Sequence, residues 1–143
     1  MHSFNRFQRA APALVLALTL LAGCHRPAPS STAVSTGAEG VARTFFEALL
    51  QGKWSTAYDA LYTESKSRCS ATQFAGLAQS YMRKVGFKPS GVSVSVSESG
   101  ADAAAVATFR QTSETDHKQF KVGMAMHRTG AAWAMVLPKE FGK

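Results

Sequence analysis

Apolar residues in the stretch 41–50 recur at helical spacing. Val41, Phe45 and Leu49 fall at four-residue steps, and each is followed by another apolar residue. This wide stripe predicts a helix of about a dozen residues. Gly52 is expected to end the helix. Residues 36–39, with the sequence TGAE, fit a capping box that would start it.

Two more helices are predicted before the pattern changes. Residues 54–61 place Trp and Leu side chains on one helical face, which indicates a short second helix. Residues 62–69 are polar and lack a period, so we expect a connecting turn there. Residues 70–73 form a second capping-box pattern, and apolar residues follow at helical spacing as far as Gly86. This stretch predicts a third helix.

Beyond Pro89 the apolar period changes from helical to alternating. Val92, Val94 and Val96 alternate with serines, which is typical of a half-buried strand. Further strands are expected at 103–110, 117–128 and 133–137, with turns at 99–102, 112–116 and 129–130. Short turns between successive strands favour an antiparallel meander. Helices followed by strands predict an α+β fold, with about three N-terminal helices packed on a four-stranded antiparallel sheet.

The first 22 residues have a different character. Arg6 and Arg9 make the leader positive, and residues 10–22 are apolar apart from Thr19. A positive leader followed by a short apolar run predicts a secretory signal peptide. A membrane-spanning helix needs about 20 apolar residues, which this run does not reach.

The end of the apolar run is more specific. Leu21, Ala22, Gly23 and Cys24 resemble the lipobox of bacterial lipoproteins. The resemblance implies that residues 1–23 are a lipoprotein signal peptide and that Cys24 is acylated and becomes the mature N-terminus. The lipid bilayer would then be the first partner of the chain. Several acyl chains hold a protein stably in a membrane.

The residues that follow Cys24 extend this interpretation. Residues 24–39 hold two prolines and many small polar residues, so we expect a lipidated N-terminus and flexible linker. His25 stands where an aspartate tends to retain lipoproteins of Gram-negative bacteria at the inner membrane. By that resemblance, the expected location is the outer membrane, facing the periplasm.

Charge and cysteines narrow the classes of function. The net charge of +7 falls to about +5 once two leader arginines are removed. No basic run interleaved with aromatic residues is present, so nucleic acid is not an expected partner. The second of the two cysteines, Cys69, has no intramolecular partner if Cys24 is acylated, and a small buried residue is the favoured interpretation. No spacing of Cys and His indicates a metal, and no cofactor is implied.

The arrangement of the helical motifs resembles a known superfamily. Residues 42–49, ARTFFEAL, and residues 52–58, GKWSTAY, are similar to the NTF2-like superfamily, especially to its small envelope lipoproteins. The resemblance covers residues 40–137 and is carried by core and corner positions. It implies an NTF2-like domain over 40–143, in which the sheet curves around an apolar interior.

The inward-facing apolar residues have two interpretations. They form a pocket for a small apolar ligand, since methionine and aromatic side chains suit such sites, or they fill the core. The candidate pocket residues are Phe46, Trp54, Tyr58, Phe120, Met124, Met126, Trp133 and Met135. A third expectation is that the outer sheet face, with Gly123 and Ala125, binds an envelope protein.

Enzymatic activity is the alternative. The resemblance includes ketosteroid isomerases and related cyclases, which use an acid or histidine directed into the apolar interior. His117 and His127 share the outward parity of their strand, and no inward carboxylate–histidine pair is predicted. We therefore expect no catalytic residues and a non-catalytic, membrane-anchored binding domain.

Overall fold

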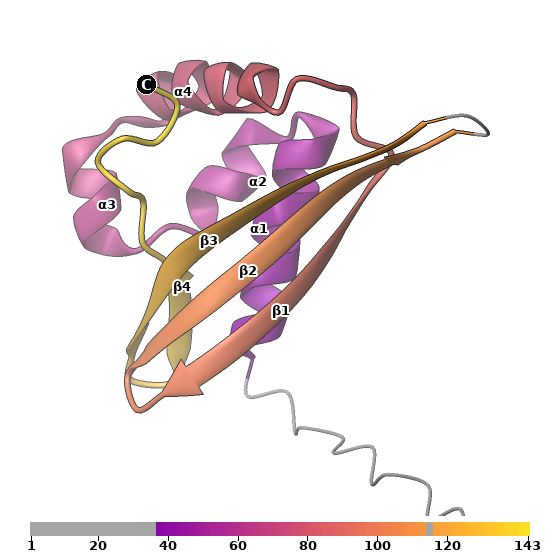
Figure 1. The fold of residues 1–143 in the computed structure, drawn as a ribbon. Helices are drawn as coiled ribbons and strands as arrows, with labels where there is room; N and C mark the ends of the chain where they lie inside the picture. Colours follow the sequence, from indigo (N-terminus) through magenta and orange to yellow (C-terminus); the bar gives the residue numbers. More distant parts are fainter. Residues whose placement is uncertain (1–36, 114–115) are drawn as a thin grey trace, which may run out of the picture. The chain divides into compact units, whose positions relative to one another are not determined.

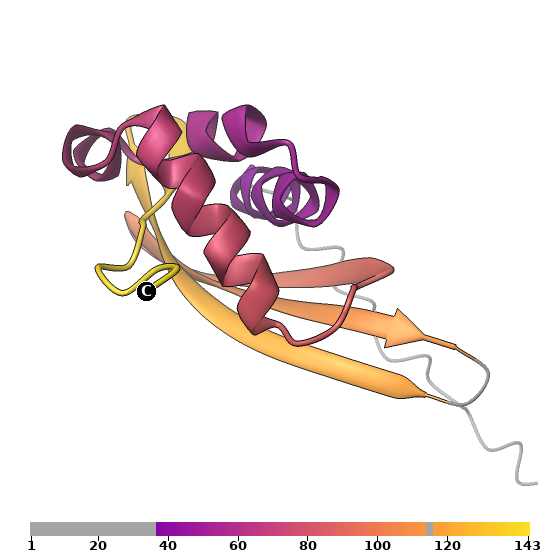
Figure 2. The ribbon, with the colours of Figure 1, turned by 90° about the horizontal axis from the view of Figure 1, so that it is seen from above.

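The described part of the chain forms two layers, with four helices on one face of a four-stranded sheet (Figures 1 and 2). The computed structural model describes residues 37–113 and 116–143. In chain order the elements are α1 (Ala38–Gln51), α2 (Trp54–Asp59), α3 (Thr63–Arg68), α4 (Ala71–Lys84), β1 (Gly91–Ser99), β2 (Asp102–Thr112), β3 (His117–Thr129) and β4 (Ala132–Met135). The strands are antiparallel in the order β1-β2-β3-β4. The predicted α+β class and the meander are confirmed.

Helix α3 lies where the sequence predicted a turn, so that interpretation of residues 62–69 is wrong. The helix carries no apolar stripe, and the side chain that it buries is Ser65, which is 1% exposed. A helix whose buried residue is a serine has no apolar periodicity, so it is not predicted from the spacing of apolar residues. Helix α2 is shorter than predicted and ends at Asp59, because Leu61 forms a parallel bridge with Met135 instead.

The starts of the two long helices differ. At α4 the Ser70 side chain accepts the backbone N–H of Gln73, and the Gln73 side chain accepts the N–H of Ser70, which confirms the predicted capping box. At α1 the cap residue is Gly37, which makes no side-chain capping bond. Glu39 is therefore not the third helical residue, and the capping box predicted there is wrong. Thr36 lies outside the described residues.

The alternation along the strands orients the sheet as predicted. On β3, Met124 and Met126 are buried and Phe120 and Val122 are half-buried beneath the helices. On β2, every second residue from Ala103 to Phe109 is buried. The core between the layers is aromatic and aliphatic. Its largest fully buried side chains include Phe45, Phe46, Leu49, Phe74, Phe109, Met126 and Met135.

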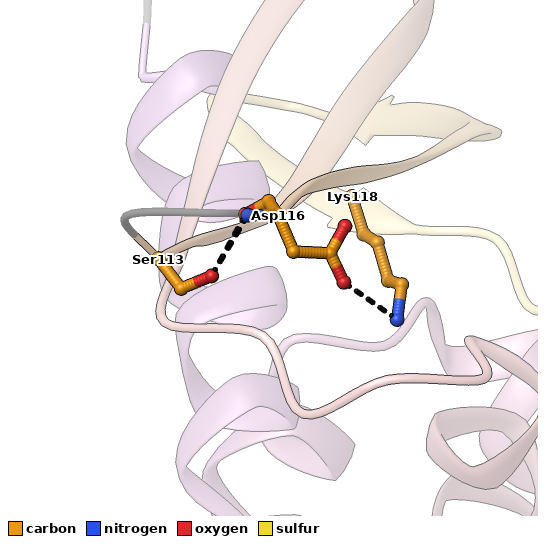
Figure 3. A network of polar contacts seen from close by, with 3 residues as sticks. All are labelled: Ser113, Asp116 and Lys118. Carbon is orange, nitrogen blue, oxygen red and sulfur yellow. Dashed lines mark hydrogen bonds and ion pairs between the residues drawn. The ribbon is translucent and has the colours of Figure 1, made fainter.

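Polar contacts close the hairpin between β2 and β3 (Figure 3). The Asp116 N–H donates to Ser113 Oγ at 3.0 Å, and the Asp116 carboxylate pairs with Lys118 at 2.8 Å. The Ser113 N–H donates in turn to the Asp116 carbonyl oxygen at 3.0 Å. These bonds lie directly beside the first cross-strand pair, Thr112 with His117. The register of the whole hairpin follows from that pair.

The N-terminal predictions lie outside this part of the chain. Residues 1–23, Cys24 and the linker as far as residue 36 are not among the described residues. Helix α1 begins at Ala38, inside the segment predicted as linker. No helix within the described ranges is long and apolar enough to cross a membrane.

Candidate functional site

The candidate pocket residues lie in or beside the hydrophobic core. Five are buried, and three are partly buried against the core. The buried ones are Phe46, Met124, Met126, Trp133 and Met135, and the others are Trp54, Tyr58 and Phe120. Their contacts are with other core side chains: the Phe46 ring, for example, lies edge-on to Phe109 with centroids 6.1 Å apart. Core filling, one of the two interpretations, accounts for this burial.

A residue that the sequence analysis missed completes this interior. Phe141 is 4% exposed and lies parallel to Phe74, with ring centroids 5.8 Å apart. It also stacks on Tyr81, with centroids 4.6 Å apart. The C-terminal residues run from β4 back toward α4 (Figure 1). An isolated Phe in the polar stretch after Pro138 gives no periodic signal from which its burial can be predicted.

Helix α3 holds the segment that carries Phe141, which we call the C-terminal segment (residues 137–143). The Leu137 N–H donates to the buried Ser65 Oγ at 3.0 Å, and the Arg68 guanidinium donates to the Leu137 carbonyl oxygen at 3.2 Å. Both backbone groups of Leu137 are therefore satisfied by α3 side chains. The unpredicted helix thus fixes the start of the segment that closes the interior.

Tyr81, at the edge of the aromatic stack, has a buried hydroxyl with no hydrogen-bond partner among the described residues. Burial raises the pKa of Tyr81 to about 12, because the phenolate loses solvation there. The folded-state pKa lies above that of an exposed tyrosine. The resulting contribution to stability is present below about pH 10 and is lost as the pH rises through about 12.

Tyr81→Phe is therefore expected to leave the free energy of unfolding at neutral pH unchanged, or to raise it by up to about 1 kcal/mol, because no hydrogen bond is lost. It should also reduce the loss of stability between about pH 10 and 12. Urea unfolding at several pH values measures both. Tyr58→Phe is the matched control, since Tyr58 donates to the Cys69 carbonyl oxygen at 3.0 Å and should cost about 1 kcal/mol. Equal losses for the two variants would contradict this account of Tyr81.

The opposite face of the sheet carries a carboxylate–histidine pair. Asp102 Oδ1 and His127 Nδ1 are 2.7 Å apart, and the Tyr62 ring lies edge-on to the imidazole with centroids 5.1 Å away. The prediction that His127 faces outward is confirmed, but the pair was missed because only inward pairs were considered. With Thr112 opposite His117, counting ten residues along each strand places Asp102 opposite His127.

This pair lines a cleft of about 650 Å³, which we call the outer cleft. The cleft lies where the outer side of β3 meets α3 and the start of the C-terminal segment. Its charged lining residues are Glu64, Arg68, Asp102 and Lys139, and His127 lines it as well. A site with both signs of charge and an oriented imidazole suits a polar partner group.

The outer cleft lacks an activated nucleophile among the described residues. An imidazole held by a carboxylate at Nδ1 can exchange a proton at Nε2. The Ser65 hydroxyl also lines the cleft, but it is buried and accepts the Leu137 N–H. The arrangement therefore favours hydrogen bonding to a bound group over attack on it.

Two further expectations concern cysteine and metal. Cys69 is buried, and burial raises the pKa of its thiol, so its interpretation as a small buried residue is confirmed. A raised thiol pKa lowers nucleophilicity at neutral pH. Within residues 37–113 and 116–143, no group of three or more His, Cys, Asp or Glu side chains could hold a metal ion.

Comparisons with known proteins identify the fold. No model of a protein family matches the sequence, and no curated protein matches it. Among solved structures, the chain is similar to one described as "Putative NTF2-like transpeptidase" from Campylobacter jejuni, with a TM-score of 0.54 and 10% sequence identity. The match covers 70% of this chain and 97% of the other. The chain has an NTF2-like α+β fold, as its helical motifs indicated.

Proposed function

We propose that this chain is an envelope lipoprotein, anchored through acylated Cys24, whose non-catalytic NTF2-like domain binds a protein partner at the outer cleft. The observation that carries the proposal is the contrast between the two faces of the sheet. On the inner side, the Phe141 ring packs on Phe74 and Tyr81 and occupies the space beside them. The outer side presents an accessible cleft with an oriented His127. The lipobox-like motif supports the anchor, and His25 supports the outer membrane.

The surface beside the outer cleft suits a protein partner. Ala104, Gly123 and Ala125 are exposed neighbours on the outer face of β2 and β3. Their small side chains let another polypeptide approach the sheet closely. The adjacent cleft can then accept a larger side chain of the partner, and such filled pockets contribute most of the binding energy in protein interfaces.

The hypothesis has another form, in which a small apolar ligand binds in the interior. Such a ligand would compete with the chain's own Phe141 side chain for space. The space beside Phe74 and Tyr81 is occupied by the Phe141 ring. A ligand at that position must displace the C-terminal segment and expose its apolar surface, which opposes binding. Protein binding requires no such rearrangement.

Photo-crosslinking in the cell envelope tests the proposal. A benzophenone amino acid at Ala125, on the outer sheet face, is expected to give one discrete protein adduct. The matched control places it at Thr44, an exposed residue of α1 on the helical layer. His127→Ala should reduce the Ala125 adduct at least about tenfold, as expected for a residue at the centre of an interface. Equal adducts at Ala125 and Thr44 would contradict a specific outer-face partner.

The proposed lipid anchor at Cys24 is tested separately. Cys24→Ser is expected to weaken membrane attachment and to raise the share of the protein in the soluble fraction, because the acyl chains supply most of the bilayer affinity. Mass spectrometry of the wild-type protein should show acyl chains on Cys24. An unmodified cysteine there would contradict the lipoprotein assignment but would leave the crosslinking result intact.

A second candidate, an enzyme of the ketosteroid-isomerase or cyclase type, is favoured by one observation, the 2.7 Å contact between Asp102 and His127. Such chemistry relies on an acid or base enclosed by apolar walls. Here the side chains are 76% and 36% exposed, respectively, which supports a binding role instead. Turnover of a steroid-like or polyene substrate that disappears in His127→Gln would select the enzyme.

A further inference from the structure

A second cleft, of about 660 Å³, is lined by the ends of α1 and α4 and by the segment that leads from α4 toward β1. We call it the helix-end groove. Its apolar lining includes Leu50, Trp54, Met82 and Phe87, all of them partly buried. Gly52 ends α1 with a positive φ of 69° and lets the Trp54 ring lie against the helix end. The groove thus exposes part of several large apolar side chains to solvent.

The charge around the helix-end groove has one sign. Arg83 and Lys88 line it, and Lys53 and Lys84 are their exposed neighbours along the chain. No acidic residue lines this groove, whereas an acid lines each of three other clefts among the described residues. None of the four basic side chains forms an ion pair with the described part of the chain. An apolar floor with an unpaired basic rim is complementary to an anionic amphiphile.

We propose that the helix-end groove is a membrane-docking surface that binds the anionic headgroup region of a bilayer. Trp54 and Phe87 would enter the interface, where aromatic side chains are favoured, while the basic side chains contact lipid phosphates. The dipoles of α1 and α4 already favour positive charge in the last helical turn. The dipole of α4 does not account for Lys88, however, because this residue lies beyond the end of the helix at Lys84.

The length of chain between the proposed anchor and the domain favours a bilayer over a soluble acidic protein. This step rests on the proposed acylation of Cys24. The 14 residues from Cys24 to Gly37 span at most about 45 Å when extended. Helix α1, with 14 residues, is about 21 Å long. The anchor can therefore hold the far end of α1 against the same membrane, where a high effective concentration makes even a weak surface contact persistent.

The test uses residues 25–143, which retain the whole hydrophobic core from Ala38 to Phe141 but lack the anchor. In a Trp133→Phe background, Trp54 is the remaining tryptophan. We expect this protein to bind vesicles of phosphatidylcholine containing about 30% phosphatidylglycerol, and to bind pure phosphatidylcholine weakly. Binding should shift Trp54 emission to the blue and should weaken as salt rises from about 0.1 M to 0.5 M.

Charge reversals locate the surface. Arg83→Glu with Lys88→Glu should weaken binding to the anionic vesicles at least about 30-fold. The matched control, Lys118→Glu with Lys121→Glu, changes the net charge equally at exposed positions outside the groove and should retain most of the affinity. The proposal is overturned by failure to bind anionic vesicles, by equal losses in both variants, or by unchanged Trp54 emission on binding. Because residues 25–143 lack the anchor, such failures would not contradict the proposed lipoprotein assignment or the proposed outer-face partner.

Discussion

Phe141→Ala is expected to lower the free energy of unfolding by about 3–5 kcal/mol, the usual cost of deleting a buried phenylalanine ring. Phe141 is 4% exposed and covers two other rings, Phe74 and Tyr81. Its loss leaves a void or exposes both of them. Urea unfolding of residues 25–143, followed by circular dichroism and tryptophan fluorescence, measures the change.

The control for this substitution is Phe141→Leu, which keeps most of the apolar volume and should cost no more than about 1.5 kcal/mol. Phe141→Ala should also increase the binding of a hydrophobic dye, because the interior side of the sheet becomes accessible. A Phe141→Ala variant as stable as the wild type would show that the C-terminal segment is not docked in solution.

Gly142→Ala is expected to cost about 2–4 kcal/mol, from the strain of an alanine at positive φ together with overlap against α4. Gly142 has φ of 73°, and an added Cβ would lie 2.8 Å from the carbonyl carbon of Leu77, closer than real contacts allow. The neighbouring Leu77 atoms belong to the helix backbone, which cannot move aside as a side chain can.

Gly130→Ala separates the backbone strain at positive φ from the overlap with α4. Gly130 has a similar φ of 61°, but nothing lies within 4 Å of its added Cβ. It should therefore cost only the backbone strain, about 1 kcal/mol. If both variants lose the same stability, the close approach of Gly142 to α4 is not present in solution.

The two substitutions in the C-terminal segment should not be additive. Each removes the segment from α4, and once it is undocked the second change has little left to disrupt. The double variant Phe141→Ala with Gly142→Ala should therefore lose little more than the more damaging single variant. Full additivity would mean that Phe141 and Gly142 stabilise the domain independently.

The parts of the fold predicted from the sequence are those with a repeated signal. Helix α4 has apolar residues at helical spacing and a capping box at Ser70, and β1 alternates valine with serine, so both were predicted from local residues alone. Helix α3 was not predicted, because its buried residue is Ser65 and the reason for that burial, the N–H of Leu137, lies 72 residues away. Local patterns contain no information about such a partner.

The candidate site shows the same limit. The outward parity of His127 followed from strand alternation, whereas its partner Asp102 required the register of the hairpin, which local composition does not state. The inward parity of Met124 and Met126 was also predictable. The stacking of Phe141 on Tyr81 was not predictable. Phe141 lies beyond the last strand, and a single aromatic residue gives no periodic signal.

The attachment of the C-terminal segment to α3 has a consequence for the order of folding. The bonds from Ser65 and Arg68 to Leu137 join positions 72 and 69 residues apart. Closing so long a loop early costs much entropy, whereas the completed meander brings the ends together at little extra cost. Docking of residues 137–143 is therefore expected late, after the rate-limiting barrier. Weakening that contact should mainly accelerate unfolding and leave the rate of folding nearly unchanged.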